Sequence, residues 1–196
     1  MAKKKNITTN AVRIVNAAKI DCEVIEYETD GEVGADFGME IAQKTGIPPE
    51  KSFKTLVVRG DKNAIGVCCI PCHRELDLKK VAKVTGDKKV EMIHVKELLA
   101  LTGYIRGGVS PIGMKKKYPT YIDATAQSFD KIAVSGGVCG ITLMMSPDDL
   151  QKVTECKFES IINEIKKAES IVISVHVNMD GDAVGSAFSF AAALKE

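Results

Sequence analysis

The spacing of apolar residues along the chain predicts an alternation of helices and strands. Apolar positions three or four residues apart predict amphipathic helices, and alternating or continuous apolar stretches predict strands. The predicted helices cover residues 10–19, 37–44, 78–84, 96–102 and 147–153. The predicted strands cover residues 24–27, 52–59, 64–70, 90–93, 120–124, 132–135 and 141–145. This alternation is typical of a domain of mixed α/β (α+β) class.

Capping residues and turn residues support these boundaries. Asn10 and Asp77 are expected to cap helices, because their side chains can accept hydrogen bonds from the free amides of the first turn. Ser146 followed by Pro147 marks the start of another helix. The turn residues 60–63 join two predicted strands as a hairpin. Residues 103–113 contain too much glycine for a regular element and are predicted to form a functional loop.

The pattern restarts near Cys156. An amphipathic helix is expected over residues 158–167, followed by a β-branched strand at 171–175, a loop and a second helix that reaches the last residue. No linker-like composition marks the change. The restart alone predicts one domain over residues 1–157 and a helix-strand-helix fragment over residues 158–196.

The composition excludes several classes of protein. With 27 Lys and Arg against 26 Asp and Glu, the net charge of +1 gives no global attraction to nucleic acid or membranes, so any anion binding is local. No apolar run approaches the roughly 18 residues of a membrane span, and the N-terminus is polar. A cytoplasmic protein with no membrane partner is therefore expected. Its six cysteines are too few for a disulfide scaffold, and most are expected to be reduced and buried.

Lys54 is the first residue that invites a chemical role. It lies in the otherwise apolar stretch Phe53-Lys54-Thr55-Leu56-Val57-Val58, where a charge is unfavourable unless it faces a cleft or a partner. An outward-facing lysine that reaches solvent would produce the same pattern. Strand periodicity does not decide between the two.

The glycine pair Gly107-Gly108 is the second candidate. Its backbone can approach a ligand closely, and its N–H groups can bind a phosphate or a developing oxyanion. Lys115, Lys116 and Lys117 follow and place cations nearby. A structural turn followed by a solvated basic run explains the same residues.

Two further groups of residues resemble metal sites. Cys69 and Cys72, followed by His73, have zinc-site spacing, but no second ligand pair exists, which favours buried reduced thiols. His176, Asp180 and Asp182 follow a predicted strand and can converge on a divalent cation such as Mn²⁺, although a two-metal site needs more ligands. No cofactor is expected for the main domain.

Residues 7–157 resemble the YbaK/EbsC family of Cys-tRNA(Pro) deacylases, which are related to the editing domain of bacterial prolyl-tRNA synthetase. The matching segments are collinear: Tyr27-Glu28, Asp36-Phe37-Gly38, and residues 53–58, 76–83, 88–92, 102–104, 107–113 and 134–137. Many ordered matches are far more specific than one short motif. The resemblance implies a mixed, partly closed sheet surrounded by helices, with a pocket for the aminoacylated 3′ end of tRNA(Pro).

The resemblance also implies roles for individual residues. Lys54 matches the essential lysine of the family, and Gly107 and Gly108 are assigned with it to catalysis. The substrate-binding residues that we expect are Tyr27, Phe37, Ser110, Pro111, Ser135, Lys115 and Lys116. The chain departs from the family at Thr29, where a histidine is usual, and at Val138, Cys139 and Thr142, which replace two cations and an acid.

Residues 158–196 resemble the first segment of DHH-family phosphoesterases. Residues 174–186 match the first metal motif of that family, with Met179 in place of a proline. His176, Asp180 and Asp182 would be metal ligands in an intact member, but the later motifs are missing, so this segment alone is expected to be inactive. It would be a fragment of a bifunctional protein or of a clipped reading frame.

The predicted activity is the removal of cysteine from mischarged Cys-tRNA(Pro), with Cys-tRNA(Cys) as a second substrate left open. The family mechanism is attack by the thiol of the substrate on its own ester, which releases a thiolactone. Prolyl-tRNA synthetase is a second partner that the resemblance leaves open. The alternatives are a non-catalytic module that binds tRNA or a synthetase, and a component of a bifunctional phosphoesterase.

Overall fold

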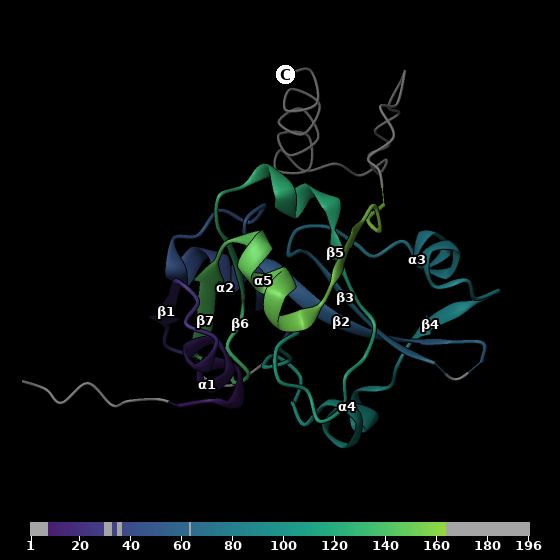
Figure 1. Cartoon of the computed structure of the whole chain (residues 1–196), viewed down its shortest axis with the longest axis horizontal. Helices are drawn as coiled ribbons and strands as arrows, with labels where there is room; N and C mark the ends of the chain where they lie inside the picture. Colours follow the sequence, from purple (N-terminus) through teal and green to yellow (C-terminus); the bar gives the residue numbers. More distant parts are fainter. Residues whose placement is uncertain (1–7, 30–32, 35–36, 63, 164–196) are drawn as a thin grey trace, which may run out of the picture. The chain divides into compact units, whose positions relative to one another are not determined.

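The computed structural model describes residues 8–29, 33–34, 37–62 and 64–163 (Figure 1). Division of the chain into compact units places the first unit at Met1–Asn163 and the second at Glu164–Glu196. The predicted strand at residues 171–175 and the predicted metal ligands His176, Asp180 and Asp182 lie outside the described residues.

The strands form two sheets. The three-stranded sheet has the order β1-β7-β6 and is antiparallel throughout, with β1 at Cys22–Glu26, β6 at Ile132–Ser135 and β7 at Ile141–Met145. The five-stranded sheet has the order β4-β2-β3-β5-β8. Its strands are β2 at Phe53–Gly60, β3 at Ile65–Pro71, β4 at Val90–Met92, β5 at Thr120–Asp123 and β8 at Lys157–Glu159.

The second sheet is mixed. β2 pairs antiparallel with both β3 and β4, whereas β5 pairs in parallel with β3 and β8. A single parallel bridge between Ser52 and Ala133 connects the two sheets, and the N–H of Ala133 donates to the carbonyl of Lys51 at 2.8 Å. The fold class predicted from the sequence is therefore confirmed.

Five α-helices and one 3₁₀ helix surround the sheets in the described part of the chain (Figure 1). The helices are α1 at Asn10–Ala17, α2 at Phe37–Thr45, α3 at Leu78–Thr85, α4 at Val95–Thr102, η1 at Ala124–Ser128 and α5 at Pro147–Thr154. Among the described residues, none of these helices is long and apolar enough to cross a membrane.

Three apolar clusters form the core. The largest joins α1 and α5 to the strands of both sheets and includes Val15, Ile122, Leu143 and Leu150. A second cluster packs α3 on β3 and β5, and a third packs α4 near the loop at 103–113. Since helices on different sides bury their apolar faces against the strands, the packed core supports both sheets.

Capping agrees with the sequence at two helices and differs at one. Asp77 accepts hydrogen bonds from the N–H groups of Lys79 and Lys80, and Ser146 accepts one from Asp149, as predicted. Helix α1 is capped by Thr9 and not by Asn10. The Asn10 side chain instead donates from Nδ2 to the carbonyl of Gly113 at 2.6 Å, so a long-range contact replaces the local one.

The prediction of a helix that begins at residue 158 is wrong for its first residues. Residues Lys157–Glu159 form β8, because parallel pairing with β5 satisfies their backbone groups. Beyond β8, Ile161 is fully buried, and its N–H donates to the carboxylate of Asp123 at 3.0 Å. The first compact unit therefore includes residues up to Asn163, and the predicted domain boundary at residue 157 stays a prediction.

Replacement of Ile161 by alanine tests this extension. Because Ile161 is fully buried in the cluster with α3, Ile161→Ala should lower the free energy of unfolding by about 2–5 kcal/mol. Denaturant unfolding of the full chain measures the change. Lys157→Ala, at an exposed position on the neighbouring strand, is the matched control and should change stability by less than about 0.5 kcal/mol. If the two variants were equally stable, residues 158–163 would not belong to the core of the first domain, and the domain would end at residue 157.

Candidate functional site

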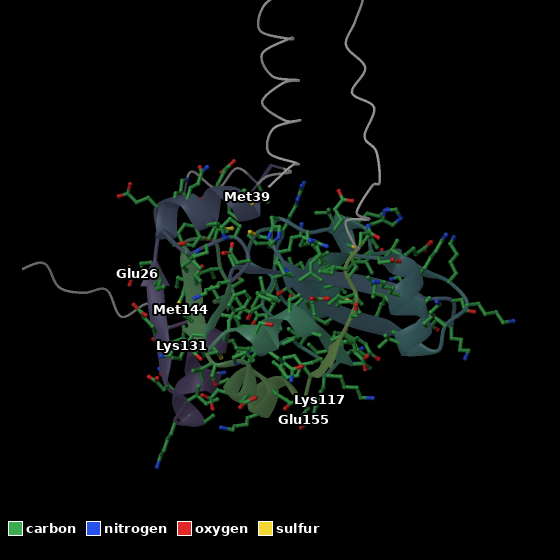
Figure 2. The ribbon with its side chains drawn as sticks, turned by 90° about the horizontal axis from the view of Figure 1, so that it is seen from above. Glu26, Met39, Lys117, Lys131, Met144 and Glu155 are labelled. Atoms are coloured by element: carbon green, nitrogen blue, oxygen red, sulfur yellow. The ribbon has the colours of Figure 1, made fainter. Side chains whose placement is uncertain are left out.

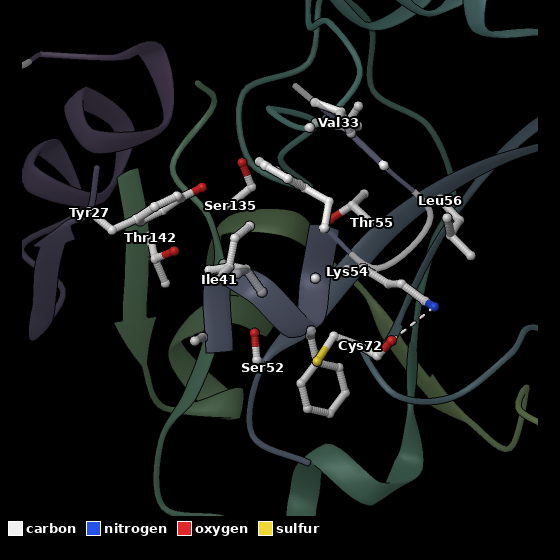
Figure 3. Close-up of a pocket in the computed structure, with 18 residues that line it drawn as sticks. Tyr27, Val33, Ile41, Ser52, Lys54, Thr55, Leu56, Cys72, Ser135 and Thr142 are labelled. Atoms are coloured by element: carbon white, nitrogen blue, oxygen red, sulfur yellow. Dashed lines mark hydrogen bonds between the residues drawn. The ribbon is translucent and has the colours of Figure 1, made fainter. Parts of the chain in front are cut away.

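A cavity of about 200 Å³ lies beside the junction of the two sheets. Strand β2 supplies residues 53–56 to its wall, and β6 and β7 supply residues 133–135 and Thr142. Helix α2, the segment after β1 and the loop at 103–113 complete it (Figure 3). Five of the residues expected from the sequence line this cavity: Tyr27, Phe37, Lys54, Gly107 and Ser135.

Lys54 lines the cavity and is partly buried. Its ammonium group donates to the backbone carbonyl of Cys72 at 3.0 Å (Figure 3). Burial lowers the pKa of the Lys54 ammonium, and the Cys72 thiol and the Glu75 carboxylate act in the opposite direction. The geometry thus favours the interpretation in which Lys54 lines a cleft, and the chemical role of this partly desolvated cation stays a prediction.

Hydroxyl groups line the part of the cavity opposite Lys54. Ser135 and Thr142 are cross-strand neighbours on β6 and β7, and Tyr27 lies beside them (Figure 3). Thr142 is only 4% exposed, and its hydroxyl has no hydrogen-bond partner among the described residues. Burial raises the pKa of the Tyr27 phenol, so it remains protonated at neutral pH and can donate. These groups can bind the polar atoms of a small ligand.

Gly107 forms the wall where the loop meets α2. Its φ of +84° favours glycine, and a β-carbon there would lie 2.6 Å from a methyl carbon of Val33 and 2.9 Å from Sγ of Cys139. Among the described residues the Gly107 N–H has no acceptor. A free backbone amide in a cavity wall is the type of donor that stabilises a developing oxyanion.

The remaining loop residues expected at the site do not line the cavity. Gly108 is buried, and its N–H already donates to the carbonyl of Ile105 at 3.0 Å. Ser110 is fully buried and accepts a hydrogen bond from the N–H of Ile112 at 3.2 Å, and Pro111 is buried next to it. The turn uses these polar groups itself, so they shape the loop from inside.

Lys115 and Lys116 are exposed and lie away from the cavity wall. The Lys115 ammonium donates to the carbonyl of Leu99 at the end of α4, at 3.1 Å. Lys117, the third lysine of this run, forms an ion pair with Glu155, and both residues are labelled in Figure 2. The basic run therefore belongs to the outer surface of the domain, and contact of its lysines with substrate stays a prediction.

Cys72 also lines the cavity, which the sequence analysis did not foresee. Its Sγ lies 3.4 Å from the carbonyl of Pro49, and burial raises the pKa of its thiol. The register of the β2–β3 hairpin is the feature that could have revealed this contact. Lys54 pairs with Ile70, and Cys72 lies two positions further along the chain, so it is expected near Lys54 on the same face of the hairpin. All six cysteines are free, and Cys68, Cys69, Cys72 and Cys156 are buried. Within the described residues, no cluster of His, Cys, Asp and Glu can hold a metal ion.

A set of hydrogen bonds fixes the loop that carries Gly107 and the β6–β7 turn that follows Ser135. The Tyr104 hydroxyl donates to the carbonyl of Ile112 at 2.6 Å, and its ring packs against Gly137 in the β6–β7 turn. Asn10 donates to the carbonyl of Gly113 at 2.6 Å, and Thr9 donates to that of Gly136 at 2.5 Å. The first turn of α1 and the Tyr104 side chain thus position both loops together.

The fold and cavity define a mixed α/β domain whose cavity lies between a lysine ammonium and a set of hydroxyl groups. Residues 35–153 match the family model of the aminoacyl-tRNA editing domain, and the chain belongs to this family.

Comparison with individual proteins gives more detail. The chain is 44% identical over 163 residues to EbsC of Enterococcus faecalis, which is named as a candidate Cys-tRNA(Pro)/Cys-tRNA(Cys) deacylase; the match covers 82% of this chain and 98% of EbsC. It is 30% identical over 76 residues to the proline–tRNA ligase of Streptomyces griseus, covering 39% of this chain and 13% of the ligase. A crystal structure described as a candidate trans-editing enzyme for prolyl-tRNA synthetase has the same fold, with a TM-score of 0.69 at 22% identity over 81% of this chain and all of that one.

Removal of the Tyr104 hydroxyl tests whether it fixes the loop. Tyr104→Phe keeps the ring but leaves the Ile112 carbonyl without a donor, so the free energy of unfolding should fall by about 1–3 kcal/mol. Exchange of the Gly108 amide hydrogen should become faster, because the turn loses its support. Tyr118→Phe is the matched control: it removes a hydrogen bond to Leu101 outside the loop and should leave Gly108 exchange unchanged. Unchanged exchange in Tyr104→Phe would show that the turn holds itself.

Proposed function

We propose that this chain is a trans-editing deacylase that removes cysteine from mischarged Cys-tRNA(Pro). The observation that carries the proposal is the cavity: residues 27, 37, 54, 107 and 135, each expected at a substrate site, come from five separate parts of the chain and line one space. Membership of the editing family and the near full-length similarity to EbsC support the same substrate class. Cys-tRNA(Cys) is a second substrate of the same chemistry.

The proposed reaction uses the thiol of the substrate as the nucleophile. The cysteinyl sulfur attacks its own ester carbonyl, the C–O bond to the ribose breaks, and the thiol proton passes to the ribose oxygen, which releases a thiolactone. A thiol with a pKa near 8.5 already supplies a few per cent of thiolate at neutral pH. The protein therefore mainly has to position the ester and stabilise the charge that develops on the carbonyl oxygen.

The chain's own groups divide this work. The Gly107 amide donates to the developing oxyanion, whereas the Gly108 amide is left out because it already donates to Ile105. The Lys54 ammonium binds the terminal ribose beside the ester, and Tyr27, Phe37 and Ser135 hold the cysteinyl group. Ser110 and Pro111 keep the loop in shape, and Lys115 and Lys116 contact tRNA phosphates outside the cavity.

The proposal extends to the partners of the protein. Its substrate is the aminoacylated 3′ end of tRNA(Pro), and the similarity to a segment of a proline–tRNA ligase supports joint action with prolyl-tRNA synthetase. Such work on charged tRNA takes place in the cytoplasm.

Removal of the Lys54 cation tests the catalytic assignment. Lys54→Ala should slow single-turnover release of cysteine from Cys-tRNA(Pro) by about 100-fold or more, because the ester loses a charged contact in a partly desolvated site. The melting temperature should stay close to that of the wild type. Lys89→Ala, which removes an exposed lysine paired with Glu91, is the control and should leave the rate unchanged.

Two other outcomes have clear meanings. A normal rate in Lys54→Ala, together with a lower melting temperature, would make Lys54 a structural strand residue. No release by the wild-type chain would favour the non-catalytic module that binds tRNA or a synthetase.

A comparison of three esters tests the thiol chemistry. Cys-tRNA(Pro) should be cleaved more than about 200-fold faster than Ser-tRNA(Pro), because shape alone discriminates such small differences by only ~10 to 200-fold. The serine hydroxyl is almost wholly protonated at neutral pH and is a poor nucleophile. Ala-tRNA(Pro), which has no nucleophile, should resist as well. Single-turnover rates with the purified chain measure all three.

Similar rates for the cysteinyl and alanyl esters would exclude the thiolactone route. They would favour an activated water, and the hydroxyl of Thr142, which faces the cavity without a partner among the described residues, would then be the first contact to examine.

A further inference from the structure

The size of the cavity limits how much of an aminoacylated tRNA can enter it. Its volume of about 200 Å³ lies below the roughly 300–1,000 Å³ of pockets that enclose drug-sized ligands. It can therefore hold an aminoacyl group but not the terminal adenosine as well. Because the aminoacyl group is esterified to the terminal ribose, the base and the nearest phosphate must lie directly outside the cavity.

Two exposed apolar side chains stand beside the wall that Gly107 forms. Ile105 is 58% exposed and precedes Gly107 by two residues, and Val138 is 41% exposed in the β6–β7 turn. Arg106 lies between Ile105 and Gly107, is exposed, and makes no ion pair with a described residue. The loop tip thus presents apolar side chains and an exposed cation next to the cavity.

The two loops that carry these residues touch each other. Sγ of Cys139 lies 3.9 Å from the carbonyl oxygen of Arg106. A β-carbon on Gly108 would lie only 3.0 Å from the Cα of Val138, so the two backbones are in close contact there. The backbones that carry Ile105, Arg106 and Val138 therefore lie close together, and we call these three exposed residues the rim.

Charge places the phosphate on the Arg106 side of the rim. Val138 also lines an open groove with Glu26, Tyr27 and Glu28, and these carboxylates would repel a phosphate there. An arginine side chain binds phosphate through two parallel hydrogen bonds. Nucleic-acid bases in single strands rest on apolar or aromatic side chains without regard to sequence.

We propose that the rim is the binding site for the terminal nucleotide of the RNA 3′ end, with the base on Ile105 and Val138 and the adjacent phosphate on Arg106. This assignment rests on the proposed function, because it follows the substrate outward from the cavity. A single-stranded RNA end is the occupant that suits apolar side chains, an exposed cation and direct continuity with an aminoacyl pocket. The affinity for tRNA then comes from this local site, because the net charge of the chain is only +1 and gives no general attraction to RNA.

Binding of an uncharged RNA minihelix tests the rim without any turnover. Fluorescence anisotropy would compare a minihelix that ends in CCA with one that lacks the final nucleotide. Arg106→Gln should weaken binding of the complete minihelix about tenfold and reduce the slope of log affinity against log salt by about one. The double variant Ile105→Ser/Val138→Ser should lose most of the preference for the complete end.

Val95→Ser is the matched control, because Val95 is 56% exposed, like Ile105, but lies at the start of α4. It should bind both minihelices like the wild type. Rim variants that bind like the wild type, a control that loses as much as they do, or a wild-type chain that does not bind the minihelix at low salt would each overturn the proposal.

A second measurement separates failure of the rim from failure of the proposed function. Release of cysteine is measured from Cys-minihelix and from cysteine methyl ester, which lacks the nucleotide. The rim variants should lose at least about fivefold more kcat/KM on the minihelix than on the methyl ester. No release from either ester by the wild type would reject the deacylase activity, and the binding measurement would still decide the rim. Equal losses on both esters would reject the rim.

Discussion

The candidate site depends on one short junction of backbone between the two sheets. The bridge between Ser52 and Ala133, with the hydrogen bond from the Ala133 N–H to Lys51, holds β6 beside the start of β2. The Cys72 N–H donates to the Ser52 carbonyl at 2.7 Å, so the end of β3 is tied to the same point. Lys54, Ser135 and Cys72 all lie within a few residues of this junction. Their relative positions are therefore set by backbone hydrogen bonds, which are more rigid than contacts between side chains.

The sequence predicts most elements of the fold, because local signals determine them. The β2–β3 hairpin, the Asp77 and Ser146 caps and the helix at α2 agree with the structure. The errors occur where distant residues compete with local ones. Asn10 is a good capping residue, but its side chain reaches Gly113, and Thr9 takes over the cap. Residues after Cys156 have a helical pattern, but pairing with β5 forms a strand, and no local signal reveals that partner.

The site residues divide in the same way. The type of residue at position 54 marks it as unusual, but the side that a strand lysine faces depends on the neighbouring sheet. The Gly107-Gly108 pair predicts two free backbone amides. In the structure the Gly108 amide is not free, because it donates to the carbonyl of Ile105. Cys72 carries no motif and enters the cavity only through the register of a hairpin. Sequence patterns therefore identify chemically capable residues, whereas tertiary pairing decides which of their groups stay available.

The groups that stay available distinguish a binding site from a turn. Folded proteins pair nearly all of their buried polar groups, since an unpaired one costs about 1–3 kcal/mol. The loop follows this rule at Tyr104, Ser110 and Gly108, whose polar groups all have partners inside the protein. The Gly107 amide and the Thr142 hydroxyl have none among the described residues, although both face the cavity. Neither group is sealed from solvent, because no fully buried side-chain polar atom of the described residues lacks a partner and Gly107 is partly exposed, so a ligand can replace water at both. The protein thus pairs the polar groups that shape the loop and leaves those at the cavity open to water or a ligand.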